Sequence, residues 1–186
     1  DGWIFEEVMP IDGRRKMNED KPRIGLLALT LEYYETLAPD LRAVRERWVR
    51  EAVEQALGEV AEVMFDGAVF RRADVEAAVD RCESAGCDAL VVLLLTYAPS
   101  QIALPALART RLPILVWNTQ ELRGVGADFE PSALIANHGV HGTQDLCNTL
   151  AREGVAFHYV TSHLEDPGAT DEVADFAAAA RAVGRL

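Results

Sequence analysis

The chain has 186 residues, of which 49% are hydrophobic and 26% are charged, a composition typical of a soluble globular protein with one core. Its 18 Lys and Arg residues against 30 Asp and Glu residues give a net charge of −12, which argues against binding to nucleic acid or to an anionic membrane. No apolar run approaches the ~18–20 residues of a membrane helix, and the first residues do not resemble a signal peptide, so we expect a cytoplasmic protein.

Residues 1–22 are mixed and charged, and we expect them to form an N-terminal arm without a core of its own. The apolar run RIGLLAL, Arg23–Leu29, predicts the first buried strand. Apolar residues then recur at three- and four-residue steps between Asp40, an expected N-cap, and Gly58, which predicts a long helix. We expect residues 23–186 to form a single domain.

Further apolar runs and helical patterns alternate along the rest of the chain. The predicted strands occupy residues 60–65, 89–95, 113–117 and 157–161. The predicted helices run from Asp74 to Gly86, over residues 100–110, over residues 143–152 and from Thr170 onward. Pro105 shortens or bends the second of these, and the last one is expected to bury Val173, Phe176, Ala177, Ala180 and Val183.

Five strands alternating with helices predict an α/β fold, a doubly wound and mainly parallel sheet with helices on both faces. The strand order typical of this flavodoxin-like pattern is 2-1-3-4-5. The three cysteines, Cys82, Cys87 and Cys147, match no common zinc spacing, and we expect reduced, mostly buried thiols.

Polar residues follow strands one, three and four, and parallel strands bring them to one sheet edge. Amides and hydroxyls at such an edge suit a polyhydroxylated ligand, because each sugar hydroxyl both donates and accepts hydrogen bonds. The alternative is that Thr, Ser and Asn cap helices there. The candidates are Thr30, Glu32, Thr96, Tyr97, Ser100, Gln101, Asn118, Thr119, Gln120 and Glu121.

His138 and His141 lie three residues apart beside two glycines. They could bind a metal, act as acid or base, or face an interface, and Asp145 is the one obvious carboxylate nearby. The chain has no Walker motif, no GxGxxG after the first strand and no GxSxG elbow, which disfavours nucleotide binding and serine-hydrolase chemistry.

Several ordered motifs resemble the N-terminal domain of the L-arabinose isomerase and L-fucose isomerase family. They span about residues 23–166 and comprise RIGLLALTLEYYE (23–35), LTYAPSQ (95–101), NTQEL (118–122), DF (128–129), NHGVHGTQDLCN (137–148) and VTSHLED (160–166). The resemblance implies the first domain of a three-domain, Mn²⁺-dependent aldose–ketose isomerase of carbohydrate metabolism. In that family the metal ligands and acid/base carboxylates lie in later domains, and the first domain contacts the sugar in a neighbouring subunit of a trimer or hexamer.

Carried over residue by residue, Gln120 of NTQEL matches a substrate-contacting glutamine, and Tyr97 and His141 would face the same cleft. Glu32, Thr96 and Asn118 complete the expected substrate-binding set. No catalytic or metal-ligating residue is assigned to this chain, which we expect to be inactive alone.

The sequence departs from arabinose isomerases at this edge. Leu31 and Glu32 stand where that enzyme carries a glutamine-histidine pair, Asn118 replaces a histidine, and Glu121-Leu122 replaces an aromatic-asparagine pair. These changes affect the expected identity of the sugar, and the expected reaction, more than the expected fold. The alternative function is a non-catalytic sugar-binding or assembly domain from a diverged relative.

Overall fold

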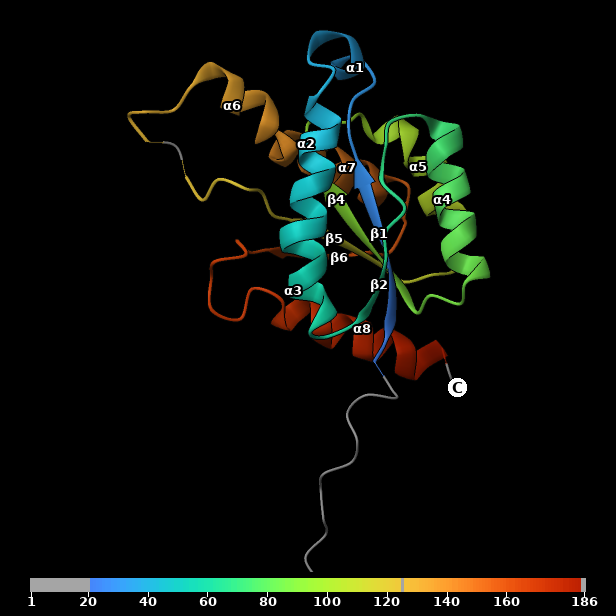
Figure 1. The fold of residues 1–186 in the computed structure, drawn as a ribbon. Helices are drawn as coiled ribbons and strands as arrows, with labels where there is room; N and C mark the ends of the chain where they lie inside the picture. The colour runs from blue at the N-terminus through green and yellow to red at the C-terminus, as the bar shows by residue number, and fades with distance from the viewer. Residues whose placement is uncertain (1–20, 125, 185–186) are drawn as a thin grey trace, which may run out of the picture.

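The computed structural model describes residues 21–124 and 126–184, so all but the last two residues of the predicted arm at 1–22 lie outside the described residues. A sheet of parallel strands occupies the centre, and helices cover both of its faces (Figure 1). The strands are β1 (Arg23–Leu29), β2 (Glu62–Met64), β3 (Ala68–Val69), β4 (Ala89–Leu94), β5 (Ile114–Asn118) and β6 (His158–Thr161). The helices are α1 (Tyr34–Leu37), α2 (Leu41–Trp48), the π-helical η1 (Val49–Val53), α3 (Glu54–Gly58), α4 (Arg72–Ser84), the 3₁₀-helical η2 (Ser100–Ile102), α5 (Leu104–Arg109), α6 (Pro131–Ala136), α7 (Gly139–Arg152) and α8 (Asp171–Gly184).

The strand order is β2-β1-β4-β5-β6, with β3 also paired to β1. This order is the predicted 2-1-3-4-5 arrangement, because β2 and β3 together take the place of the predicted second strand. The longest pairing joins β1 and β4, from Ile24 opposite Ala89 to Leu29 opposite Leu94. After Arg23, both strands carry no polar side chain, because both of their faces are covered by helices.

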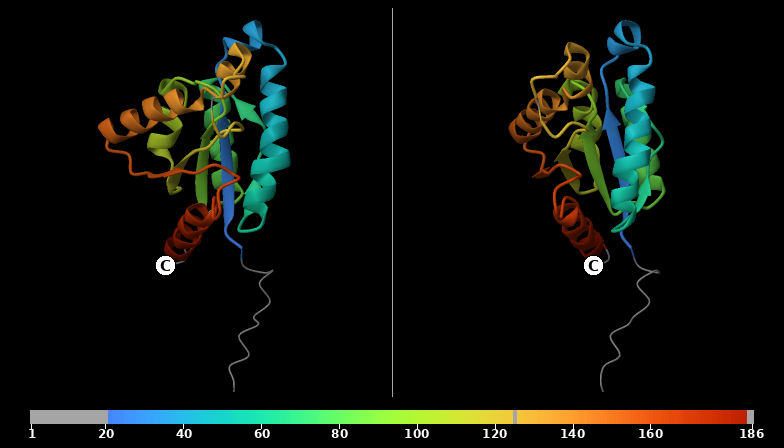
Figure 2. Two further views of the ribbon diagram at one scale, coloured as in Figure 1. Left: turned by 90° about the vertical axis from the view of Figure 1, so that its left-hand side faces the viewer. Right: turned by 60° about the vertical axis from the view of Figure 1, so that its left-hand side comes forward.

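Two apolar clusters fill the space between the sheet and its helices. The first packs η1, α3 and α8 against one face through residues such as Val49, Leu57 and Val173. The second packs α4, α5 and α7 against the other face through residues such as Val79 and Leu146. Figure 2 shows the sheet between the α2–α3 run and α7.

Among the helices that the structure describes, none has the length and the apolar sequence of a membrane span.

The break between β2 and β3 has a side-chain cause. The register with β1 shifts by one residue across Phe65–Gly67, and Gly67 has φ 131°. At this point the Glu46 carboxylate accepts the Ala68 amide at 3.0 Å and is held by Arg42 at 3.0 Å. The predicted strand at 60–65 is therefore shorter than expected and continues after a bulge.

Other predicted boundaries were wrong in ways that local pattern cannot reveal. Asp40 makes no side-chain capping hydrogen bond, and its helix includes the π-helical η1. α4 begins at Arg72 rather than Asp74, and α7 begins at Gly139 rather than residue 143. α1 and α6 were not predicted, and Val183, expected to be buried, is 69% exposed.

The core predicts a clear contrast between two leucine truncations. Leu57→Ala removes a side chain that is fully buried, so we expect the free energy of unfolding to fall by about 2–5 kcal/mol. Leu37→Ala is the matched control, because Leu37 is 53% exposed on α1, and its change should stay within about 0.5 kcal/mol. Urea denaturation of both variants measures this, and equal losses would contradict the assigned core.

Candidate functional site

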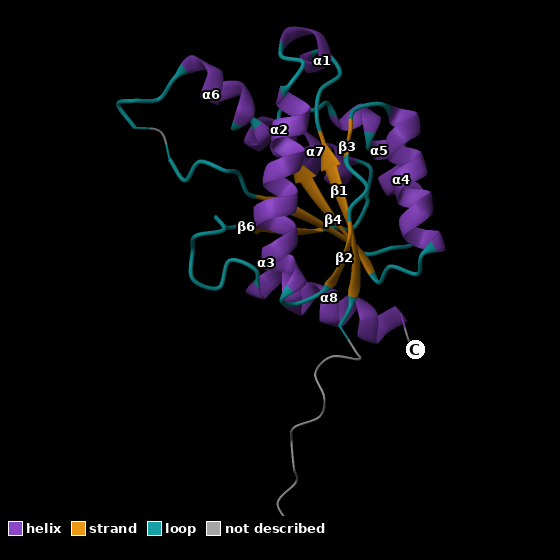
Figure 3. Ribbon diagram, in the orientation of Figure 1, coloured by secondary structure: helices purple, strands orange, loops and turns teal. Residues whose placement is uncertain are grey.

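The carboxyl ends of the parallel strands lie at the end of the molecule that carries α1 and α6 (Figure 3). Five residues of the expected substrate-binding set lie in segments that follow β1, β4 or β5 or in the first turn of α7, and the sixth, Asn118, is the last residue of β5. The topology therefore places them at one end of the sheet, the end where ligands bind in open α/β folds.

The first turn of α7 approaches the end of β4 through two buried glycines. A Cβ added at Gly139 would lie 2.0 Å from the carbonyl oxygen of Leu94, and one added at Gly142 would lie 3.0 Å from the amide nitrogen of Ala98. Only glycine allows this approach, because the opposing atoms belong to the backbone and cannot move aside alone. The glycines of the HGVHG motif are thus packing residues.

Hydrogen bonds also hold α7 against the loop after β4. The Asp145 carboxylate accepts the backbone N–H of Ser100 at 2.7 Å, and the Thr149 hydroxyl donates to the Ser100 hydroxyl at 3.1 Å. The motifs LTYAPSQ and NHGVHGTQDLCN therefore form one packed unit, although about 40 residues separate them in the sequence.

Three rings gather where these motifs meet. The ring centroids of His138 and His141 lie 4.4 Å apart in an edge-to-face contact, and those of Tyr97 and His138 lie 6.0 Å apart. Burial, and then the neighbouring His141, lowers the pKa of His138 below its ordinary value. His138 is therefore held in its neutral form, in which one ring nitrogen donates and the other accepts a hydrogen bond.

A cavity of about 410 Å³ opens on the other side of the α7 N-terminus, between the loops that follow β5 and β6. Its volume falls in the range of small-molecule pockets, about 300–1,000 Å³. Val140, in the first turn of α7, contributes the apolar part of its wall together with Leu122. The remaining lining is polar and consists of Asn118, Thr119, Gln120, Arg123, Thr161, Ser162, His163 and Asp166.

Hydrogen bonds fix the polar wall of this cavity. The Asn118 amide donates to the Thr161 hydroxyl at 3.3 Å, and the Gln120 amide donates to the Leu122 carbonyl at 3.0 Å. The buried Trp117 indole donates to the Ser162 hydroxyl at 2.9 Å, which ties the wall to the core.

The loop that carries Gln120 is anchored from three other elements. The guanidinium of Arg45, a buried residue of α2, forms an ion pair with the Glu121 carboxylate. His163 Nε2 lies 3.2 Å from the Glu121 carbonyl, and the Leu122 N–H donates to the side-chain oxygen of Asn137 at 3.0 Å. The position of Gln120 thus depends on α2, on the loop after β6 and on the segment before α7.

The charges that line the cavity compensate one another. The Arg123 guanidinium lies 2.5 Å from the Asp166 carboxylate. The pKa of Asp166 is lowered, first by the backbone N–H of His163 and then by Arg123, so this carboxylate stays ionised. A cavity with amides, hydroxyls and a compensated ion pair suits an uncharged polyhydroxylated ligand.

Helix capping does not account for the polar residues at this edge. No side-chain capping hydrogen bond is present at the N-caps of α1, α2, α5, α6 or α7. Among the described residues, three buried polar side-chain atoms lack a hydrogen-bond partner: Thr30 Oγ1, Arg45 Nε and Thr119 Oγ1. Thr30 and Thr119 follow β1 and β5 directly, and buried polar groups without partners are rare in folded proteins.

The structure does not bring the whole expected set together. Asn118 and Gln120 line the cavity, whereas Tyr97 and His141 belong to the ring cluster beside it. Thr96 is fully buried and its hydroxyl donates to the Tyr97 carbonyl at 2.9 Å.

Glu32 lies near the N-terminus of α4. Its carboxylate pairs with the exposed Arg71 at 2.7 Å. Its place in a substrate site, like that of the rest of the set, stays a prediction.

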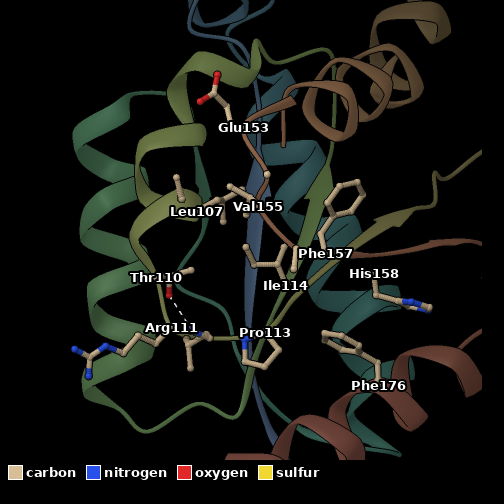
Figure 4. Close-up of a pocket in the computed structure, with 14 residues that line it drawn as sticks. Leu107, Thr110, Arg111, Pro113, Ile114, Glu153, Val155, Phe157, His158 and Phe176 are labelled. Carbon is tan, nitrogen blue, oxygen red and sulfur yellow. Dashed lines mark hydrogen bonds between the residues drawn. The ribbon is translucent and has the colours of Figure 1, made fainter. Parts of the chain in front are cut away.

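A larger cavity, of about 750 Å³, lies at the opposite end of the sheet (Figure 4). It opens between α5, the segment before β6 and α8, with Leu107, Ile114 and Phe157 on its wall. His158 and Phe176 stack at its rim with centroids 5.7 Å apart. None of the expected site residues lines it, and it lies at the amino ends of β5 and β6, so we assign the candidate site to the smaller cavity.

The smaller cavity is lined in part by residues for which the sequence predicted no role in the site. Arg123, Thr161, Ser162 and Asp166 line it, and no site role was predicted for them. Two of them could have been found by the rule that ligands bind at the carboxyl ends of parallel strands. Thr161 is the last residue of β6 and Ser162 follows it, just as Asn118 and Thr119 stand at the end of β5. Arg123 lies in a Gly-rich loop whose path depends on tertiary contacts.

The described residues do not fit a divalent metal on their own. No three His, Cys, Asp or Glu side chains among them gather closely enough to hold a metal ion. His138 and His141 contact each other, but no carboxylate joins them within the part of the chain that is described.

The chain is similar to a known protein family and to a known enzyme. The family model described as fucose/sulfoquinovose isomerase, N-terminal domain, matches residues 35–186. The L-arabinose isomerase of Nocardioides sp. (strain ATCC BAA-499 / JS614) is 27% identical over 105 residues, which cover 56% of this chain and 21% of that relative. The chain thus matches only about a fifth of the relative's length.

The glycine contact predicts opposite effects of two Gly→Ala substitutions. Gly139→Ala places a methyl group against the Leu94 carbonyl, and we expect a loss of about 1–3 kcal/mol in the free energy of unfolding. Gly58→Ala is the control, since a Cβ there meets nothing within 4 Å, and it should gain about 0.4–1 kcal/mol. Urea denaturation measures both, and a neutral Gly139→Ala would refute the close approach.

The ring cluster predicts a pH dependence. Because the pKa of His138 lies below its ordinary 6.5, the native state binds fewer protons than the unfolded chain between the two values, so His138 lowers stability as the pH falls through this window. In a ¹H NMR titration, His141→Ala should move the pKa of His138 toward 6.5 without reaching it, because burial is the larger cause. His158→Ala, at the opposite end of the sheet, should leave it unchanged, and a pKa of His138 above 6.5 would contradict the assignment.

Proposed function

Because the chain belongs to the family of fucose/sulfoquinovose isomerase N-terminal domains, we propose that it is the first domain of a longer aldose–ketose isomerase-like protein. In this proposal the cavity at the carboxyl edge forms one wall of the sugar site, and Gln120 and Asn118 contact sugar hydroxyls. The observation that carries it is the amide- and hydroxyl-lined cavity of about 410 Å³ within the matched region.

The proposal divides the chemistry between this domain and the rest of the protein. In this proposal the Mn²⁺ ligands and the acid/base carboxylates come from other domains of the full-length protein. This chain would bind and orient the sugar through neutral hydrogen-bonding groups, and would complete the site of a neighbouring subunit in a trimer or hexamer. The isolated chain is expected to be inactive and to lack a tight Mn²⁺ site.

A second function is favoured by one observation. Glu32 stands where arabinose isomerases carry a substrate-reaching pair, and here its carboxylate is engaged with Arg71 on the far side of β1. A parent that had lost such a contact would retain sugar binding or an assembly role without turnover. The two functions differ in the full-length protein, because only the first converts an aldose to a ketose.

The test is an aldose panel assayed on the full-length protein with and without Mn²⁺. Gln120→Ala should raise KM for the accepted sugar about 2- to 10-fold, the worth of one neutral hydrogen bond. Gln55→Ala, an exposed position on α3, is the matched control and should leave KM and kcat unchanged.

Three outcomes separate the possibilities. Turnover with an unchanged KM in Gln120→Ala would refute the role of that residue. Calorimetric sugar binding without turnover would favour the second function. Neither binding nor turnover with any sugar would refute the isomerase and the sugar-binding function, and would leave only the assembly role.

A further inference from the structure

Two of the three cysteines meet at the C-terminus of α4. Gly86 has φ 70°, its N–H donates to the Glu83 carbonyl at 3.1 Å, and the Cys87 N–H donates to the Cys82 carbonyl at 3.0 Å. This pair of bonds is the Schellman motif, in which the residue third from the helix end contacts the second residue beyond the cap. Here those two positions are Cys82 and Cys87, and their side chains lie in the same buried cluster.

The backbone already holds the two cysteines within disulfide range. A disulfide requires α-carbons within about 7 Å of each other. A hydrogen bond of 3.0 Å from the amide of one residue to the carbonyl of the other leaves at most about 7 Å between their α-carbons, even along a straight path. The thiols are also close enough that each shifts the pKa of the other.

Strand β1 holds this turn in place. A Cβ at Gly25 would lie 2.3 Å from the Cys82 sulfur, so the thiol occupies the space that this glycine leaves. The Arg23 guanidinium donates to the Ala85 carbonyl at 2.7 Å, and the Arg23 N–H donates to the Asp88 carboxylate at 2.7 Å.

The environment distinguishes the two thiols. The hydrogen bond from Cys82, and to a lesser degree the Arg23 guanidinium, lowers the pKa of Cys87, although burial opposes this. The same hydrogen bond together with burial raises the pKa of Cys82. Cys87 is therefore the thiol that ionises first and acts as the nucleophile, because thiolates react and thiols do not.

We propose that Cys82 and Cys87 form a redox-active pair that closes to an intramolecular disulfide when a peroxide is reduced. The Cys87 thiolate attacks one peroxide oxygen, the O–O bond breaks, and the departing hydroxide takes a proton to become water, which leaves a sulfenic acid on Cys87. The Cys82 sulfur then attacks the Cys87 sulfur, and the S–O bond breaks. The hydroxyl leaves as water with the proton of Cys82, so two thiols and one peroxide give one disulfide and two waters.

The burial of both thiols sets the route and the pace of this reaction. Cys82 is 7% exposed and Cys87 is 5% exposed, so a peroxide reaches them when the turn after α4 opens briefly. Cys147 is half-buried, and burial raises its pKa to about 11. It serves as an internal control for reaction without a partner.

The experiment treats the folded chain with hydrogen peroxide, blocks free thiols with iodoacetamide and digests with trypsin. Cleavage after Arg81 and Arg109 releases both cysteines of the pair in one peptide, residues 82–109, whereas Cys147 lies in the peptide of residues 124–152. We expect the first peptide to lose two hydrogen atoms and take up no iodoacetamide, and the second to be alkylated. Dithiothreitol before the blocking step should restore alkylation at both sites of the first peptide.

Variants test the pairing. Cys82→Ala and Cys87→Ala should each abolish the loss of two hydrogens, and Cys147→Ala should leave it unchanged. If either variant of the pair does not fold, the experiment on the unaltered chain still decides. Double alkylation of residues 82–109 after peroxide, sulfinic acid on Cys87 in place of a disulfide, or a disulfide that includes Cys147 would each overturn the proposal.

Discussion

The candidate site depends on the contact of two backbones, the first turn of α7 against the end of β4. Gly139 permits this contact, because any side chain at that position would collide with the Leu94 carbonyl. The contact sets where His138, Val140 and His141 project, so one helical turn supplies a wall of the cavity and two rings of the neighbouring cluster. Asp145 and Thr149 then hold the loop after β4 to the same helix through Ser100.

The strands could be predicted from the sequence because a strand that is buried on both faces consists of a continuous run of apolar residues. RIGLLAL and ALVVLL are apolar on both faces, and the structure places these runs in adjacent strands at the centre of the sheet. The features that were missed depend on partners far along the chain. Glu46 breaks the second strand by accepting the Ala68 amide, and no local pattern records that a carboxylate from α2 reaches there.

The sequence predicted at which end of the sheet the candidate site lies, but not which residues line its cavity. The edge rule correctly places the residues after β4, β5 and β6 at one end, since it depends only on strand direction. Which side chains face the same space depends on pairings made in three dimensions. Thr96 and Tyr97 are adjacent, yet the first is sealed within the core and the second meets His138, and Glu32 is held on the α4 side by Arg71.

The loop after β5 connects the cavity with a second surface. Arg45 holds Glu121, the neighbour of Gln120, and also lines an apolar hollow of about 350 Å³ with Val44 of α2 and Ile135 of α6. Its Nε is buried without a described partner, so its alignment is controlled mainly by the ion pair with Glu121. In the proposed assembly, a surface that packs into this hollow would press on the residue that positions the sugar-contacting loop. Subunit contact and sugar contact would then be coupled through a single guanidinium.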